Sequence, residues 1–296
     1  MSDVLVGLIG GTGLGEALTK EAGGERVEVD TPFGKPSSPI TLTEVGGQRV
    51  AILARHGLAH QLNPSLVPYR ANIFALKKLG VTHIVASGAT GILRESIAPR
   101  DLVICDQVID KTLRPGRTFF EDFTVHIEFA YPFCEDLRRL LCDCGKGLST
   151  TVHPGGTYVC MEGPQFSTRA ESLMHRQWGG DLIGMTTMPE AKLAREAEIC
   201  YALIAIPTDY DCWREHEPGT SADAVLESII VNMNAGTAHA IELLKRAVPK
   251  IAAAAKADCP CRAALAKAIW TDRRAIDAKA VEKLGPLVDK YLGKSK

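Results

Sequence analysis

The sequence predicts an α/β protein, because short apolar runs with the length of buried strands alternate with amphipathic helical stretches along most of the chain. In one such pair, a helix that opens at Pro68 and ends at Gly80 is followed by an apolar strand over 81–87. The chain has 296 residues, of which 46% are hydrophobic. This length is long for one domain and short for two full ones. We therefore expect a main domain over 1–250 and a helical appendage over 251–296 that packs on the body or on a neighbouring subunit.

Charge and cysteine content indicate which partners and which cellular location to expect for this protein. Lysine and arginine number 34 against 35 acidic residues, so nucleic acid is not an expected partner. The N-terminus lacks a basic leader and no segment is apolar enough to cross a bilayer, which predicts a cytoplasmic protein without a membrane partner. Several of the nine cysteines, including Cys105, Cys160 and Cys200, lie in apolar runs where a reduced thiol simply packs. Cys259 and Cys261 show no partner ligands in the sequence, which favours a local disulfide or free thiols over a metal.

The first predicted strands end in residues suited to anions. A strand over 4–9 leads into a glycine-rich turn over 10–15, whose backbone amides can converge on a phosphate or simply make a tight connection. The dinucleotide fingerprint fails because its third glycine position is Glu16. A hairpin is expected over 40–54, and Arg55 and His56 follow its second strand. These two residues either bind a ligand or are an ordinary surface arginine and a packed histidine.

The middle of the chain continues the alternation. Strands are expected at 102–105, 157–162 and 181–185, and helices at 135–144 and 168–178. Thr168 and Glu171 have the spacing of a capping box, whereas the threonines at 186 and 187 would either cap the next helix or donate hydroxyls to an anion. A long helix with an apolar stripe starts near 222, and Pro249 is expected to end it.

Two carboxylates follow the most apolar strand. The run over 200–207 ends in Asp209 and Asp211, which as residues i and i+2 of a strand would project together from its carboxyl end. Such a pair can donate a proton to one atom of a ligand and accept a hydrogen bond from another, as the edge of a purine base requires. A solvated strand end followed by a turn is the alternative.

Taken together, these motifs resemble those of the purine nucleoside phosphorylase family, and the similarity covers roughly residues 4–250. The segments that carry the resemblance are, in chain order, Gly10–Gly13, Thr31–Ser37, Ala54–Gly57, Tyr69–Asn72, Glu162–Glu171, Met185–Glu190 and Thr208–Trp213.

The resemblance implies a catalytic domain with a central mixed sheet curling toward a barrel, flanked by helices, and a homo-oligomer, trimer or hexamer, with active sites at subunit boundaries. It implies phosphate binding by Thr12, Arg55, His56, Gly88, Ala89 and Thr186, as a co-substrate. It further implies contacts to the nucleoside from Phe166, Ser167 and Met185, and a 5′ pocket formed by Ala222, Val225, Leu226 and a neighbour's His126.

The implied reaction is phosphorolysis of a 5′-methylthio adenine nucleoside in purine and methionine salvage. Asp209 would be the general acid and Asp211 would accept from the 6-amino group, with neither metal nor organic cofactor. Gly88, Gly184 and Ala222 are smaller than the residues common at these positions in the family. Broader or 6-oxopurine specificity is the alternative activity, and a nicotinamide-dependent oxidoreductase or a non-catalytic nucleoside-binding protein are alternatives of other classes.

Overall fold

The computed structural model describes residues 5–11, 14, 17, 23–215, 219–255 and 258–293. Its strands are β1 Val6–Gly10, β2 Glu25–Val27, β3 Ile40–Val45, β4 Gln48–Ala54, β5 His83–Ile92, β6 Leu102–Ile104, β7 Gln107–Asp110, β8 Val152–His153, β9 Thr157–Cys160, β10 Leu182–Gly184 and β11 Cys200–Tyr210. Its α-helices are α2 Tyr69–Lys78, α3 Glu135–Gly145, α4 Arg169–Gln177, α5 Thr187–Glu196, α6 Ala222–Ala254, α7 Ala278–Leu284 and α8 Asp289–Leu292. Three short 3-10 helices follow α6, namely η1 Pro260–Ala263, η2 Arg273–Ala275 and η3 Gly285–Leu287.

The described strands form one mixed sheet that branches at β5. Along one path the order is β2-β3-β4-β1-β5-β10-β9-β7, while β11 also pairs with β5 and continues to β6 and β8. β1, β4, β5 and β11 run parallel to one another, and β10 is antiparallel to β5. The predicted fold class is confirmed.

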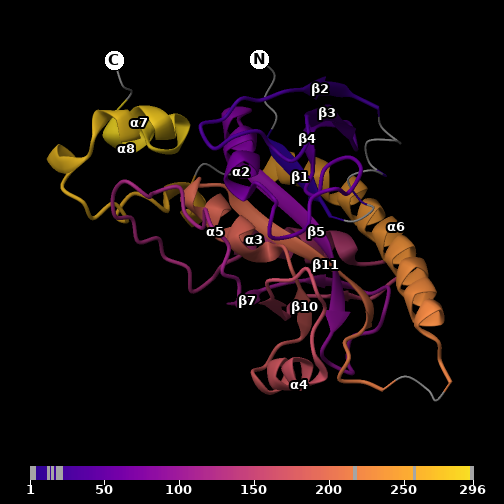
Figure 1. Ribbon diagram of the computed structural model, residues 1–296. Helices are drawn as coiled ribbons and strands as arrows, with labels where there is room; N and C mark the ends of the chain where they lie inside the picture. The colour runs from indigo at the N-terminus through magenta and orange to yellow at the C-terminus, as the bar shows by residue number, and fades with distance from the viewer. Residues whose placement is uncertain are drawn as a thin grey trace.

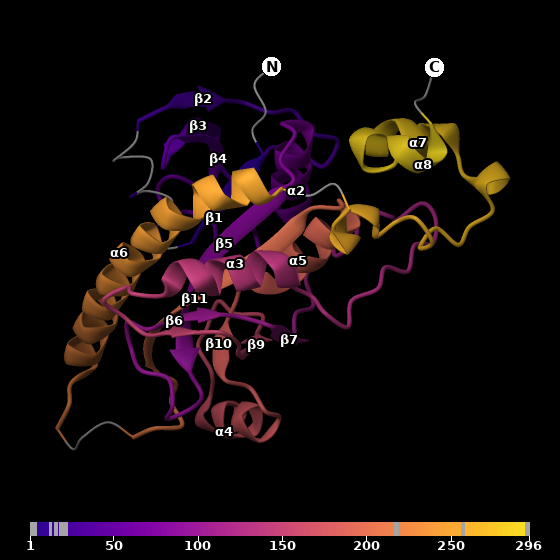
Figure 2. The same ribbon diagram turned by 180° about the vertical axis from the view of Figure 1, so that it is seen from behind.

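Helices cover both faces of this sheet (Figures 1 and 2). α2 and α5 pack on one face, where they share a hydrophobic core with η3 and α7. α3 and α6 pack against each other on the other face, around a second core. The β5 and β11 strands are buried between these layers, and most of their residues are apolar or glycine.

Local sequence signals account for most element boundaries. The hairpin β3–β4 turns at Gly46 and Gly47, both with positive φ, as their position between two strands predicts. Thr168 caps α4 through the predicted capping box, in which its side chain accepts from the backbone amide of Glu171. Thr186 makes no side-chain cap on α5, so its hydroxyl is not used in that role.

The prediction that Pro249 ends the long helix is wrong, because α6 continues through it to Ala254. Proline within a helix removes one backbone hydrogen bond and crowds the preceding turn. The β3–β4 turn packs against this point of α6. A Cβ on Gly46 would lie 2.7 Å from Pro249 and 2.8 Å from the carbonyl of Lys245.

The C-terminal segment over 258–293 packs on the body of the protein. Glu198 accepts hydrogen bonds from the amide of Leu265 and the hydroxyl of Tyr291, and the peptide of Ile269 bridges to Val125. Among the described residues, no helix has both the length and the apolar character needed to span a membrane.

Candidate functional site

Several parallel strands end at the same edge of the sheet, and most of the predicted site residues lie there. β1 leads into Gly11, β4 leads into Arg55, and β11 ends at Tyr210. The register between β1 and β5 stops at Ile9 and Ala86, so the small residues that follow on β5 extend beyond the end of β1. The carboxyl ends of parallel strands are where α/β proteins bind ligands.

Arg55 is buried, and a buried glutamate compensates its charge. Its Nε and Nη2 atoms donate to Glu190 over 2.7 and 2.9 Å, and its Nη1 donates to the carbonyl of Ser87 over 2.8 Å. Burial acts to lower the pKa of Arg55, but the Glu190 carboxylate outweighs it and raises that pKa. The guanidinium is therefore a fixed, permanently charged donor whose remaining N–H groups are oriented by Glu190.

Two of the other implied phosphate contacts, Gly88 and Thr186, lie near this guanidinium. A Cβ on Gly11 would lie 3.1 Å from Arg55 Nη1 and 3.3 Å from the Cα of Gly88. A Cβ on Gly88 would meet only the hydroxyl of Thr186, at 3.6 Å, which leaves room beside that hydroxyl. A guanidinium, a hydroxyl and glycine backbone are the groups that a phosphate dianion needs. The predicted residue Thr12 lies outside the described residues.

His56 is neutral near pH 7. Burial, followed by the charge of Arg55, lowers the pKa of His56 to about 4. Its Nδ1 lies 2.8 Å from the carbonyl of Leu62, and because a carbonyl only accepts, Nδ1 carries the proton. The other ring nitrogen, Nε2, is then an acceptor.

Both aspartates lie next to Gly91. Asp209 is the register partner of Gly91, beyond an irregularity in the β5–β11 pairing that follows Pro207. A Cβ on Gly91 would lie 3.3 Å from the Cβ of Asp211. Asp211 is 8% exposed, and its Oδ2 has no hydrogen-bond partner among the described residues. A buried carboxylate oxygen without a donor is costly unless a ligand supplies one.

A polar clamp from α6 fixes the strand end that carries Asp209. The side-chain amide of Asn232 donates to the carbonyl of Thr208 over 2.8 Å, and its oxygen accepts from Arg100 over 2.7 Å. The amide of Arg100 in turn donates to the carbonyl of Pro207. These contacts join three separate parts of the chain at the last residues of β11.

The loop after β9 lies next to the end of β10. A Cβ on Gly163 would lie 2.6 Å from the sulfur of Met185, so the two segments touch. The thiol of Cys212 donates to the carbonyl of Ser167 over 3.3 Å, which brings this loop beside the residue that follows Asp211. Phe166, on the same loop, is 81% exposed.

The implied 5′ pocket is only partly formed within one chain. Val225 and Asp209 line the same cavity of 350 Å³ between β11 and the start of α6. Ala222 and Leu226 are exposed and do not line it, and His126 lines a different cavity. The structure therefore does not bring His126 to the Val225 cavity of its own chain.

Comparison with known proteins identifies the family. A family model described as the phosphorylase superfamily matches residues 5–249. The chain belongs to the phosphorylase superfamily. The resemblance stated from the sequence motifs is thereby confirmed.

Individual members of this superfamily are similar over almost the whole chain. The S-methyl-5′-thioadenosine phosphorylase of Geobacter sulfurreducens is 46% identical over 97% of this chain and 99% of its own length. The protein of the same name from Danio rerio is 46% identical over 84% of this chain and 90% of its own length.

Solved structures of the superfamily are also similar. A methylthioadenosine phosphorylase from an Antarctic soil metagenomic library superposes with a TM-score of 0.88, at 42% identity, over 97% of this chain and 100% of that one. A Schistosoma mansoni methylthioadenosine phosphorylase in complex with adenine gives 0.82 at 37% identity, over 90% of this chain and 99% of that one.

Three site-supporting residues of this phosphorylase superfamily member were not predicted from its sequence. Glu190 stands in a quoted motif, but nothing local indicated that it would pair with Arg55. Arg114 is 3% exposed and joins the loops around the site, donating to the carbonyls of Met188 and Glu162. Asn232 lies on the predicted long helix, for which only the apolar stripe was noted. Each contact is long-range, so no spacing in the sequence reveals it.

The structure explains one of the small residues at the site. A Cβ on Gly184 would lie 2.0 Å from the hydroxyl of Tyr158, which is 1% exposed and accepts from the amide of Thr186 over 3.4 Å. The tyrosine therefore occupies the space that a larger residue at 184 would need.

Proposed function

We propose that this protein cleaves S-methyl-5′-thioadenosine with phosphate, yielding adenine and 5-methylthioribose 1-phosphate. The observation that carries the proposal is the unpartnered Oδ2 of buried Asp211 beside Asp209, on strand ends adjoining the Arg55 site. The names of the similar proteins support this choice of substrate, as does the bound adenine of the Schistosoma mansoni structure.

The phosphate side supplies the nucleophile. Hydrogen phosphate would lie against Arg55, the hydroxyl of Thr186 and the backbone of Gly88 and Ala89, and neutral His56 would accept its P–OH proton through Nε2. A phosphate oxygen bonds to the anomeric carbon as the N-glycosidic bond breaks. The bonding electrons pass to the purine, while the dianion stabilises the cationic character of the ribosyl centre.

Asp209 would supply the proton that the departing adenine needs. The hydroxyl of Thr208 lies 3.2 Å from the carbonyl of Thr90 and 2.6 Å from Oδ1 of Asp209. The hydroxyl of Thr208 is the donor to Oδ1 of Asp209, so it fixes the orientation of this carboxyl group. The proton lost by hydrogen phosphate balances the one gained by adenine, so the reaction needs no organic cofactor.

Asp211 would recognise the 6-amino group, since its buried Oδ2 requires a donor that an amino group provides. Met185 would lie under the ribose and Phe166 with Ser167 beside the base.

The assay that tests this function measures free adenine released from methylthioadenosine, with and without phosphate. Methylthioinosine and inosine run alongside. We expect phosphate-dependent adenine release and slower release of hypoxanthine. Preferential release of hypoxanthine, or release that does not depend on phosphate, would reject the proposal.

The Asp211→Asn variant is expected to change the choice of base. An asparagine amide can donate to a 6-carbonyl, so the ratio of kcat/KM for methylthioinosine over methylthioadenosine should rise by about 10- to 100-fold. The measurement is kcat and KM for both nucleosides. An unchanged ratio would show that Asp211 does not contact position 6.

We further propose that the active unit is a homo-oligomer in which His126 completes the 5′ pocket of a neighbour. Phe166, Leu226 and Ile230 are exposed apolar side chains close to or within the site elements, as an unfilled subunit boundary requires. His126 itself lies away from the Val225 cavity.

Dilution is therefore expected to lower specific activity together with the sedimentation coefficient. His126→Ala should raise KM for methylthioadenosine more than for phosphate. Sedimentation at assay concentration that revealed a fully active monomer would contradict this prediction.

A further inference from the structure

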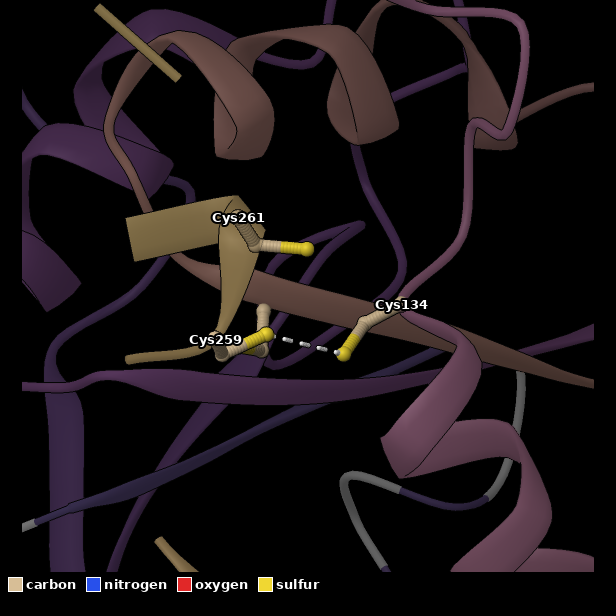
Figure 3. Close-up of side chains that lie close together, drawn as sticks. Cys134, Cys259 and Cys261 are labelled. Atoms are coloured by element: carbon tan, nitrogen blue, oxygen red, sulfur yellow. Dashed lines mark hydrogen bonds between the residues drawn. The ribbon is translucent and has the colours of Figure 1, made fainter. Parts of the chain in front are cut away.

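Four cysteines from three distant parts of the sequence meet in the interior. Cys134 caps α3, Cys200 begins β11, and Cys259 and Cys261 flank the proline that opens η1. All four are buried, and their sulfur atoms lie within 4.8 Å of one another. Figure 3 shows the thiols of Cys134, Cys259 and Cys261 gathered in one place. We call these four residues the thiol cluster.

The spacing within the thiol cluster suits one thiophilic ion. Sγ of Cys259 lies 3.8 Å from that of Cys134 and 3.5 Å from that of Cys200. A disulfide needs about 2.05 Å, and all four cysteines are free thiols. Tetrahedral zinc–sulfur bonds of ~2.3 Å place neighbouring sulfurs about 3.8 Å apart. The printed sulfur–sulfur distances are thus close to those of a tetrahedral zinc site.

We propose that the thiol cluster binds one structural Zn²⁺ ion. Four sulfur ligands exclude Mg²⁺ and Ca²⁺, which take oxygen ligands, and a closed set without room for water is typical of structural zinc rather than catalytic zinc. On binding, the four thiols lose four protons and form four zinc–sulfur bonds, with no change of oxidation state. The complex carries two negative charges.

A cavity lined by charges of both signs lies beside the thiol cluster. It has a volume of 1090 Å³ and is lined by Cys134, Cys259 and Cys261, by the basic residues Arg138, Arg139, Arg195 and Lys267, and by the acidic residues Asp106, Glu128, Glu135 and Asp136. The guanidinium of Arg195 is held there by the carbonyl of Tyr131, at 2.7 Å. The cavity gives an ion access to the thiols of the cluster.

The bound ion would fasten the C-terminal segment to the body. Cys134 and Cys200 belong to the body, and their backbones are already joined to the sheet, since the amide of Cys134 donates to the carbonyl of Tyr201. Cys259 and Cys261 belong to the segment that follows α6. Farther along that segment, Ala268 accepts from the amide of His126 over 2.9 Å, so the position of residue 126 depends on how the segment is held.

Elemental analysis of the full-length protein, purified under reducing conditions without chelators, tests the proposal. We expect about one zinc per chain. The double variant Cys259→Ser, Cys261→Ser should retain almost none. The control is Cys142→Ser, because Cys142 is a half-buried thiol on α3 outside the cluster, and its zinc content should match that of the parent.

Cobalt substitution of the unaltered chain provides a second measurement that does not depend on the double variant folding. Co²⁺ added to the metal-free, reduced protein should give the sulfur-to-cobalt charge-transfer band and the visible bands of a tetrahedral thiolate site, and Zn²⁺ should displace them. A purified chain that holds no zinc and takes up neither ion would overturn the proposal. A mass of the purified chain that is two hydrogens lower for each disulfide would also overturn the proposal. Zinc retained by the double variant would overturn it as well. Metal content is measured without substrate, so this test is independent of the proposed reaction.

Discussion

Asp209→Asn is expected to lower kcat for methylthioadenosine by about 10²–10⁴-fold while KM changes much less. Asparagine keeps the shape of the side chain and a hydrogen bond with the hydroxyl of Thr208, which lies 2.6 Å from Oδ1 of Asp209. It cannot transfer a proton to the departing purine. The loss should therefore fall on the chemical step, and steady-state kinetics with methylthioadenosine and saturating phosphate measure it.

Asp211→Asn is the matched control, because it replaces the same functional group two residues away. It should change the choice of base while Asp209→Asn should not. A second control uses Thr208→Val, which removes the hydroxyl that orients Asp209 and should give a smaller loss. Full turnover by Asp209→Asn would show that the proton comes from another group.

Glu190→Gln is expected to lower the free energy of unfolding by about 3–5 kcal/mol, because it leaves the buried charge of Arg55 without its partner. Arg55 is 1% exposed and Glu190 is fully buried, and two hydrogen bonds of 2.7 and 2.9 Å join them. A glutamine would also turn an N–H group toward the guanidinium. Urea unfolding at a fixed protein concentration measures the change. A loss below about 1 kcal/mol would mean that the guanidinium finds another partner.

Glu196→Gln is the control, since Glu196 is a second buried glutamate on α5 but has neutral donors, the hydroxyl of Thr118 and the amide of Phe119. Burial raises the pKa of Glu196 from 4.5 to about 7. The protonated form is thus favoured by folding, and the stability that this provides is complete below pH 4.5 and lost as pH rises through about 7. Glutamine stays neutral at all pH values. The variant should therefore be less sensitive to pH and, above about pH 7, no less stable than the parent.

Local rules allowed most of the sheet strands and the cap of α4 to be predicted from the sequence, whereas the short strands β2, β7 and β8 were not predicted. The β3–β4 hairpin and the capping box of Thr168 depend on residues within a few positions of one another, so their signals survive in any context. Pro249 is the exception among them. The helix tolerates it because tertiary packing, here against the turn at Gly46, outweighs local propensity.

The site was predicted less completely, because the contacts that hold its residues in place join positions far apart in the sequence. The motifs named Arg55, His56 and the two aspartates, and the structure brings Arg55 together with Gly88 and Thr186. It was Glu190, 135 positions from Arg55, that could not be inferred from spacing. The cysteines show the same limit, since Cys259 and Cys261 alone are weak evidence for a metal. Their partners Cys134 and Cys200 become visible only once the chain is folded.

The pairing of residues 124–126 with the C-terminal segment determines when this part of the protein can fold during translation. The backbone amide of Thr124 donates to the hydroxyl of Thr271, which lies 147 positions later in the sequence. The backbone of residue 125 bridges to residue 269, and the amide of residue 126 donates to the carbonyl of residue 268. A growing chain that has reached residue 250 already contains every predicted phosphate and base contact. It still lacks the segment whose residues 268 and 269 contact residues 126 and 125. Because domains fold from the N-terminus during synthesis, these contacts can form only near the end of translation, so a prematurely terminated chain would lack the hydrogen-bond partners of residues 124–126.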